Sequence, residues 1–232
     1  MTSPENQKGT LYIIATPIGN LGDMTLRAIE TLKSVDLIAA EDTRTSGHLL
    51  THFGISIQMT SYHDHNERSK APELINSLND GKSIGLISDA GTPLISDPGY
   101  RLVNMAIENG IDVIPIPGPS SILAALVASG FPTDRFCFEG YLPKTSGRLK
   151  RTLDELAEEA RTIVIFETPH RIMKSLPVML ESLGDRDIFI GRELTKKFEE
   201  KMRGKISELL PILEKRTLKG EIVIVVPGIG NR

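Results

Sequence analysis

The sequence contains very little cysteine, because Cys137 is the only one among its 232 residues. One cysteine excludes an internal disulfide and a zinc site built from several cysteines. No stretch of about 20 apolar residues is present, so the sequence predicts no membrane-spanning helix. The polar N-terminus, MTSPENQK, predicts no secretory signal. These absences favour a cytoplasmic protein in a reducing compartment.

Several sequence signatures of well-known chemistry are also missing. The chain has no G-x-G-x-x-G dinucleotide fingerprint, no G-x-x-x-x-G-K-[ST] phosphate loop and no G-x-S-x-G nucleophile elbow. His48 and His52 stand four residues apart in a helical pattern, but the glutamate of the H-E-x-x-H motif is absent. We therefore expect no metal site.

The net charge of −3 argues against a surface that is positive throughout for binding nucleic acid. The charge is unevenly distributed, however. Residues 1–118 hold 8 basic and 14 acidic residues, whereas residues 119–232 hold 19 basic and 16 acidic residues. Such asymmetry is typical of a ligand-handling half joined to a half that meets a polyanion, although compositional scatter explains it equally well.

Apolar, β-branched runs alternate with helical patterns along the chain, which predicts an α/β fold. The segment Pro115–Pro119 (PIPGP) interrupts this alternation with three prolines and a glycine, so it predicts a stiff connector. We therefore expect two α/β domains with mostly parallel sheets. They cover residues 9–117 and 118–232 and follow a flexible N-terminal tail over residues 1–8.

Polar or glycine-rich loops follow four consecutive strands of the first predicted domain. In open parallel sheets ligands bind outside the carboxyl ends of the strands, so these loops predict an active-site cleft. The loops are TPIGNLGD (16–23), EDTR (41–44), HDHN (63–66) and DAGTPLISDPG (89–99). The last loop combines glycine, proline and aspartate, so its backbone can approach a ligand closely.

Two basic clusters occur in the second predicted domain. Either cluster could contact the phosphates of a nucleic acid, or it could be an ordinary solvated face. Acidic residues just after the first cluster favour the second interpretation. The clusters are Lys144, Arg148, Lys150 and Arg151, and Lys196, Lys197, Lys201, Arg203 and Lys205.

Several motifs together resemble the tetrapyrrole methylase superfamily, and within it the branch that acts on ribosomal RNA. The resemblance covers about residues 9–228. TPIGNLGDMT, EDTR and DAGTPLISDPG are specific to that branch, whereas PGPSS and the terminal GEIVIVV are shared more widely.

This resemblance implies two α/β domains, S-adenosylmethionine bound in the cleft between them, and a homodimer. It also implies 2′-O-methylation of the ribose of cytidine 1402 in 16S ribosomal RNA of the small ribosomal subunit. The cofactor contacts carried over from the family motifs are Pro17, Ile18, Asp89, Ala90, Gly91, Thr92, Leu94, Ser120, Ser121 and Glu167.

The group that accepts the proton of the ribose hydroxyl stays open among Glu41, Asp42 and His63, which all follow predicted strands. Arg44 could bind a phosphate or orient a carboxylate. Two alternative functions also stay open. One is methylation of carbon on a tetrapyrrole, and the other is non-catalytic binding of RNA or the ribosome.

Overall fold

The computed structural model describes residues 8–230, in which the chain divides into two compact units. Unit 1 is Met1–Ser120 and unit 2 is Ser121–Arg232. The expected boundary after residue 117 lies three residues before this division. The flexible tail expected over residues 1–8 lies outside the described residues, except for Lys8.

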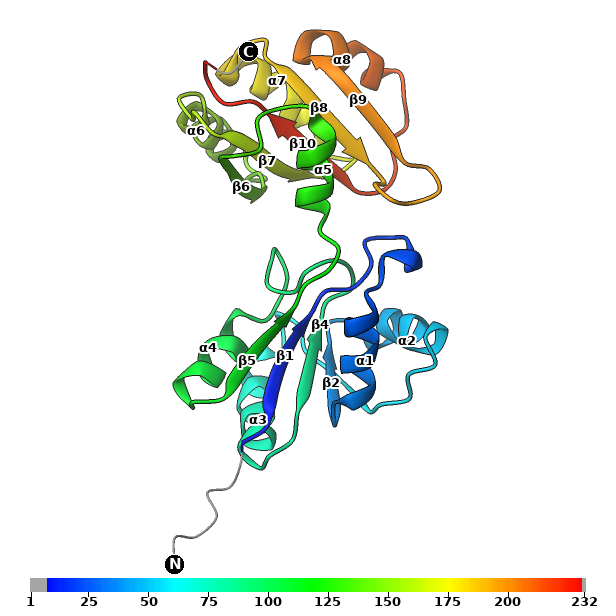
Figure 1. Ribbon diagram of the computed structural model, residues 1–232. Coiled ribbons are helices and arrows are strands. Elements are labelled where there is room, and N and C mark those ends of the chain that lie inside the picture. Colours follow the sequence, from blue (N-terminus) through cyan, green and yellow to red (C-terminus); the bar gives the residue numbers. More distant parts are fainter. Residues whose placement is uncertain (1–7, 231–232) are drawn as a thin grey trace, which may run out of the picture. The chain divides into compact units, whose positions relative to one another are not determined.

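Unit 1 contains a five-stranded sheet whose strands are all parallel (Figure 1). The order is β3-β2-β4-β1-β5, as expected for an α/β fold. The strands are β1 (Thr10–Ile14), β2 (Leu37–Ala40), β3 (Met59–Ser61), β4 (Ile84–Ile87) and β5 (Asp112–Ile116). The helices are the short 3₁₀ helix η1 (Leu21–Asp23), α1 (Leu26–Ser34), α2 (Thr43–His52), α3 (Glu67–Asn79) and α4 (Tyr100–Glu108).

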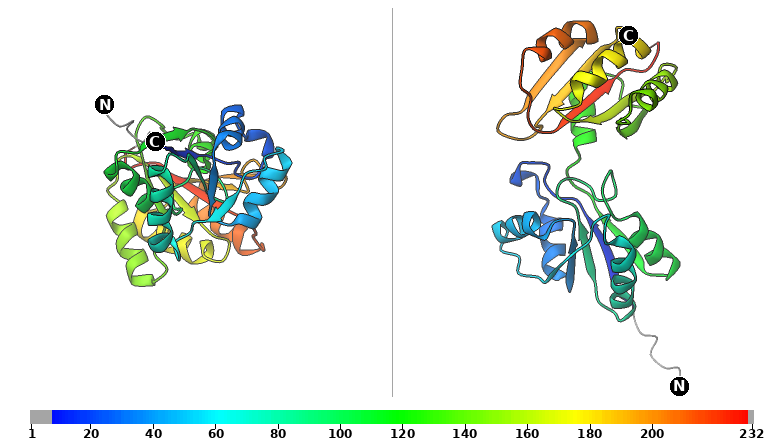
Figure 2. Two further views of the ribbon diagram at one scale, coloured as in Figure 1. Left: turned by 90° about the horizontal axis from the view of Figure 1, so that it is seen from below. Right: turned by 180° about the vertical axis from the view of Figure 1, so that it is seen from behind.

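Helices cover both faces of this sheet (Figure 2). On one face, α1 and α2 pack through Ala28, Leu32 and Leu50. On the other face, α3 and α4 pack through residues such as Leu74 and Leu102. Strands buried on both faces consist of continuous apolar runs, which is why β4 is buried along its whole length.

The proline-rich connector begins two residues later than expected, because Pro115 belongs to β5. Proline has no N–H to donate to a neighbouring strand, so within sheets it is found mainly on edge strands, where that side of the residue faces away from the sheet. It is tolerated here because β5 is an edge strand that pairs only with β1.

Unit 2 contains a second five-stranded sheet in the order β6-β7-β10-β8-β9. Its strands are β6 (Phe136–Tyr141), β7 (Thr162–Glu167), β8 (Asp187–Arg192), β9 (Glu200–Lys205) and β10 (Ile222–Val226). Its helices are α5 (Ser121–Ser129), α6 (Ser146–Leu156), α7 (Ile172–Leu183) and α8 (Ile206–Glu214). No helix among residues 8–230 is long and apolar enough to span a bilayer.

The expectation of a mostly parallel sheet is wrong for unit 2. Only β6 and β7 pair in parallel, whereas β10 pairs antiparallel with both β7 and β8. Strands β7 and β8, which α7 connects, run in the same direction. Strand β10 lies between them and runs in the opposite direction. The alternation of strands and helices predicts the crossover correctly but says nothing about this late insertion.

Strand β9 is absent from the sequence-based expectation. Its residues, EKMRGK, are mostly charged and alternate half-buried with exposed positions, and the strand forms the antiparallel edge beside β8. Residues 193–199 join the two strands, and this link is too short for a helical crossover. Part of the second basic cluster therefore lies on an edge strand.

The strand β10 divides the core of unit 2 into two layers. Ile222 and Ile224 pack on the side of α6, α7 and α8. Val223 and Val225 pack on the opposite side with α5. Because successive side chains of a strand point to opposite faces, this one five-residue run holds both layers to the sheet.

Candidate active site

The loops that follow β1, β2 and β4 are joined by hydrogen bonds at the carboxyl edge of the unit 1 sheet. Thr16 and Gly91 exchange two backbone hydrogen bonds, with N···O distances of 2.8 and 3.0 Å. The backbone N–H of Asp42 donates to Asp89 Oδ1 at 3.2 Å, and the N–H of Asp89 donates to Glu41 Oε2 at 3.3 Å. Parallel pairing thus brings together loops that lie far apart in the sequence.

The loop after β4 has an unusual backbone. Four of its residues have positive φ, two of them glycines (Gly91, φ +80°; Gly99, φ +143°) and two not (Leu94, φ +73°; Ser96, φ +65°). A Cβ at Gly99 would lie 2.8 Å from Leu94 Cδ1, so this position needs glycine for space as well as for conformation. Left-handed non-glycine residues are costly and concentrate at ligand-binding segments.

The residues assigned to the cofactor in unit 1 lie on this loop and on the one beside it. Asp89, Ala90, Gly91, Thr92 and Leu94 all follow β4, and Pro17 and Ile18 follow β1. Ile18 is 6% exposed, and a Cβ added at Gly91 would lie 3.3 Å from its Cγ2 atom. Gly91 is thus buried against Ile18, and a side chain at this position would press on that residue.

Four carboxylates gather at this edge: Glu41, Asp64, Asp89 and Asp97. Burial raises the pKa of Glu41, and the nearby Asp89 and Asp64 raise it further. Burial also raises the pKa of Asp97 from 3.8 to about 6, with Glu41, Asp89 and Asp64 adding to the shift. Asp64 and Asp97 also line a hollow of about 400 Å³. The cluster favours either bound protons or a positively charged ligand.

Asp97 was not among the residues selected from the sequence. It lies ten residues beyond the end of β4, and the loop brings it back beside the strand end only through its left-handed turns. The one available signal was the second aspartate of the motif DAGTPLISDPG.

Asp42 and Arg44 form an ion pair with each other. Arg44 Nη2 lies 2.7 Å from Asp42 Oδ2, and the Asp42 side chain also accepts the N–H of Arg44 at the start of α2. These contacts lower the pKa of Asp42 to about 2, which makes it a weak proton acceptor. The Arg44 side chain is 88% exposed, so the guanidinium stays accessible to an anion.

His63 is half-buried in the turn that follows β3. Its backbone N–H donates to Asn66 Oδ1 at 2.9 Å, and its ring lies 6.0 Å from that of His65. Among residues 8–230, its Nδ1 atom is buried without a hydrogen-bond partner. One nitrogen of the ring is therefore left without a protein partner among these residues.

The remaining cofactor candidates lie at the junction of the units or in unit 2. Ser120 is the last residue of unit 1, and Ser121 is the first residue of α5. Glu167 ends β7 and is 1% exposed. Its carboxylate accepts hydrogen bonds from the Ser175 hydroxyl and the Thr168 N–H and lies 3.6 Å from Arg171. A cofactor contact by Glu167 remains a prediction, and its carboxylate is engaged within unit 2.

The first basic cluster is exposed around the start of α6. Lys150 pairs with Asp154 at 3.2 Å and with Glu181 at 3.0 Å. Within the described part of the chain, Lys144, Arg148 and Arg151 form no ion pair. Three of the four cations are thus available to phosphates, and their role in RNA binding remains a prediction.

Comparison with known protein families gives a match to the tetrapyrrole (corrin/porphyrin) methylases over residues 10–210. Among curated relatives, a "Ribosomal RNA small subunit methyltransferase I" of Halalkalibacterium halodurans is 48% identical over 98% of this chain and 78% of its own length. Proteins of the same name from Vibrio cholerae and Mesorhizobium japonicum are 51% and 53% identical. They are matched over 94% and 93% of this chain and over 77% and 74% of their own lengths.

Among solved structures, the methyltransferase CobJ matches with a TM-score of 0.71 at 16% identity over 97% of this chain and 96% of its own. A uroporphyrin-III-C-methyltransferase from Thermus thermophilus matches with a TM-score of 0.66 at 17% identity, over 94% of both chains. At such low identity these two structures support the fold alone.

We predict that Asp97→Asn changes the pH dependence of stability. A folded-state pKa near 6, above the ordinary 3.8, means that the folded state holds more protons than the unfolded state between these values. The stabilisation from the protonated carboxyl is complete below about pH 4 and is lost as the pH rises through about 6. The asparagine side chain does not ionise, so the variant keeps its stability as the pH rises. Its free energy of unfolding should therefore exceed that of the wild type by about 1–2 kcal/mol at pH 7.5.

Urea unfolding at pH 4 and at pH 7.5 measures this difference. Asp23→Asn, which changes an exposed aspartate of η1, is the charge-matched control. The same wild-type-to-variant difference at both pH values would show that Asp97 ionises as an ordinary surface carboxyl.

Proposed function

Because the chain belongs to the tetrapyrrole methylase family, and within it to the ribosomal RNA small subunit methyltransferase I proteins, we propose that it methylates 16S ribosomal RNA. The donor is S-adenosylmethionine and the acceptor is the ribose 2′-oxygen of cytidine 1402 in the small ribosomal subunit. One observation carries this proposal. Identity to relatives of that name is 48–53% over almost the whole chain, against 16–17% to the structures of tetrapyrrole methylases.

The carboxyl edge of unit 1 fits S-adenosylmethionine in two respects. Gly91 is held by Thr16 and packs on Ile18, which fixes the position of the loop after β4, and the carboxylates of Glu41, Asp89 and Asp97 complement a cation. When bound, S-adenosylmethionine supplies an electrophilic methyl group on a positively charged sulfur. We assign its binding to the residues named for it above on the loops after β1 and β4, and to Ser120, Ser121 and Glu167.

This chain's residues must then position the ribose and accept the proton of its hydroxyl. Glu41 suits the second role better than Asp42, since its pKa is raised whereas that of Asp42 is about 2. The N–H of Asp89 holds Glu41 Oε2 in place. His63 and Asp97 are the other acceptors at this edge. Arg44 and the cluster of Lys144, Arg148, Lys150 and Arg151 would bind phosphates.

A methyl-acceptor assay tests the function directly. Purified protein, labelled S-adenosylmethionine and small ribosomal subunits that lack the modification should give label in 16S RNA, on one ribose 2′-oxygen, as mapped by mass spectrometry. Uroporphyrinogen should receive no label. Label on the tetrapyrrole, or none on the subunits, would refute the proposal. A homodimer in the cytoplasm is part of the same proposal, and analytical ultracentrifugation tests the dimer.

We predict that Gly91→Ala weakens S-adenosylmethionine binding at least about tenfold, because a Cβ here presses on Ile18, which is also assigned to the cofactor, and strains a left-handed backbone. Calorimetry measures the affinity. Gly54→Ala is the matched control, since Gly54 also has positive φ (+62°) but open space around it. Equal affinities for the two folded variants would remove the Gly91 loop from the cofactor site.

We further predict that Glu41→Gln lowers the single-turnover methylation rate at least about 100-fold, as expected for loss of a general base. Asp42→Asn should lower it less than about tenfold, because a carboxylate with a pKa near 2 is a weak base. Rates are measured at saturating cofactor with small subunits, and Glu73→Gln on α3 is the control. A Glu41→Gln rate within about tenfold of wild type would leave positioning alone as the source of catalysis.

A further inference from the structure

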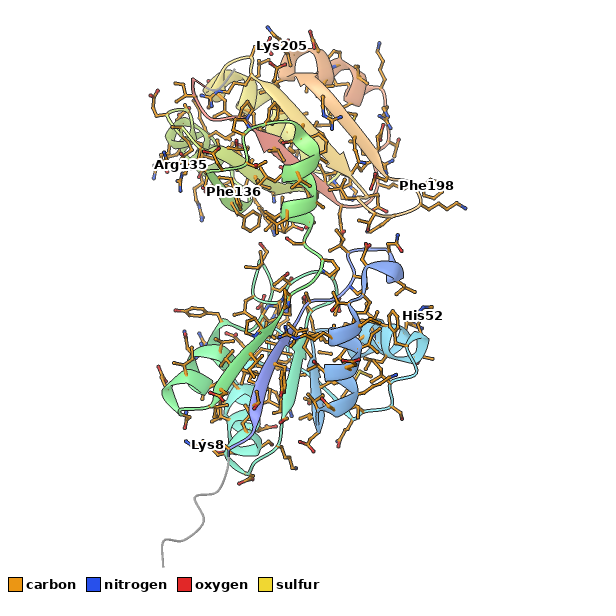
Figure 3. All side chains as sticks on the ribbon, in the orientation of Figure 1. Lys8, His52, Arg135, Phe136, Phe198 and Lys205 are labelled. Carbon is orange, nitrogen blue, oxygen red and sulfur yellow. The ribbon has the colours of Figure 1, made fainter. Side chains whose placement is uncertain are left out.

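The loop between β8 and β9, residues 193–199, exposes a phenylalanine that no part of the proposed reaction uses. Phe198 is 68% exposed. Figure 3 labels it on this loop, beyond the ends of the two strands. Its neighbours in sequence, apart from Thr195, are all lysines and glutamates (TKKFEEK), so the loop itself supplies no second apolar side chain beside the ring. A protein partner generally requires a larger apolar patch, whereas stacking on a nucleobase requires a single ring.

The loop is held in a defined conformation. Glu193 and Thr195 have positive φ (+50° and +67°), which is uncommon for residues with side chains and rare for a β-branched one. The Thr195 N–H donates to Glu199 Oε2 at 2.7 Å, and Arg192 Nη2 donates to the carbonyl of Phe198 at 3.2 Å. At Gly220 (φ +88°) a Cβ would lie 2.3 Å from the Glu193 carboxyl carbon, so the chain before β10 packs directly against the loop. The aromatic ring is therefore presented on a constrained backbone.

Around the ring, the acidic side chains have ion-pair partners, whereas one basic side chain has none among the described residues. The acidic residues are paired: Glu193 with Lys196 at 2.9 Å, Glu199 with Lys201 at 2.6 Å, and Glu200 with Arg192 and Arg216 at 3.0 and 2.7 Å. Lys197 pairs with no carboxylate among residues 8–230, and its Nζ lies 5.7 Å from the centre of the Phe198 ring. The available charge beside the ring is thus a cation, which complements a phosphate.

We propose that Phe198 stacks on an unpaired base of the RNA substrate while Lys197 contacts the adjoining phosphate. This inference rests on the proposed function and adds to it a contact site in unit 2, distinct from the first basic cluster. An aromatic ring beside a cation on a constrained loop is the combination that binds single-stranded nucleic acid without reading its sequence.

The absence of tryptophan from the chain provides a direct test. In Phe198→Trp the new indole is the only one, and stacking on a base should quench its fluorescence when a cytidine-rich single-stranded oligoribonucleotide is added. Phe198→Ala should weaken binding of that oligonucleotide and of small subunits about 10-fold, in keeping with the loss of one stacked base. Phe198→Tyr should bind like wild type, and Phe198→Leu should bind like Phe198→Ala, because leucine keeps the apolar surface but has no π face.

Ile212→Ala is the matched control, since Ile212 is a half-exposed apolar side chain of α8 in the same unit. Lys197→Ala should reduce the slope of log affinity against log salt by about 0.7. S-adenosylmethionine affinity should be unchanged in all these variants. Unaltered oligonucleotide binding by Phe198→Ala would overturn the inference. Blue-shifted indole emission from Phe198→Trp before RNA is added would also overturn it, because such emission would mean that protein already covers the ring. A shift that depends on protein concentration would identify a second copy of the chain as the cover, and a shift that does not would identify this chain itself.

The two proposals fail separately. If the wild type methylates small subunits and Phe198→Ala does so with unchanged KM, only the stacking inference fails. If the wild type transfers no methyl group but quenching occurs and needs the aromatic ring, the proposed reaction fails and the RNA contact stands.

Discussion

The pair of backbone hydrogen bonds between Thr16 and Gly91 is the constraint on which the site of unit 1 depends. It joins the loop after β1 to the loop after β4 just beyond the point where the two strands stop pairing. Both loops would otherwise be long surface connections with many conformations. The link fixes where the left-handed turns of the second loop begin, and these turns return Asp97 to the sheet edge. The two loops are thereby held to each other by the same kind of backbone hydrogen bonds that hold the strands of the sheet.

The carboxylates at this edge lie close together although their negative charges repel one another. Partial burial raises the pKa of Glu41, Asp89 and Asp97, and neighbouring carboxylates raise each of these pKa values further. An isolated fold gains nothing from placing three acids together. A cationic ligand reverses the sign of these interactions, because each carboxylate then stabilises it. The same groups that destabilise the empty edge therefore favour an occupied one, as is common at functional sites.

The sequence predicts unit 1 better than unit 2, and the reason is physical. Parallel strands end at one edge, so the sequence alone places the loops that hold Glu41 and Asp89 together. Asp97 could not, because its position depends on turns at Leu94 and Ser96 that no local preference indicates. In unit 2, β9 consists largely of charged residues, and the insertion of β10 between β7 and β8 is a choice of tertiary pairing. The Asp42–Arg44 ion pair likewise follows from side-chain geometry and not from spacing.

The central position of β10 has a consequence for how the protein is made. Every residue of this strand is buried, and it is the last strand of its sheet to leave the ribosome. Unit 1 has all of its strands by Ile116 and can fold while synthesis continues. The edges of β7 and β8 that β10 will occupy stay unpaired until Ile222–Val226 has been added. Nascent unit 2 thus carries two open, apolar strand edges until its sheet is complete, and open edges of this kind favour association with other chains.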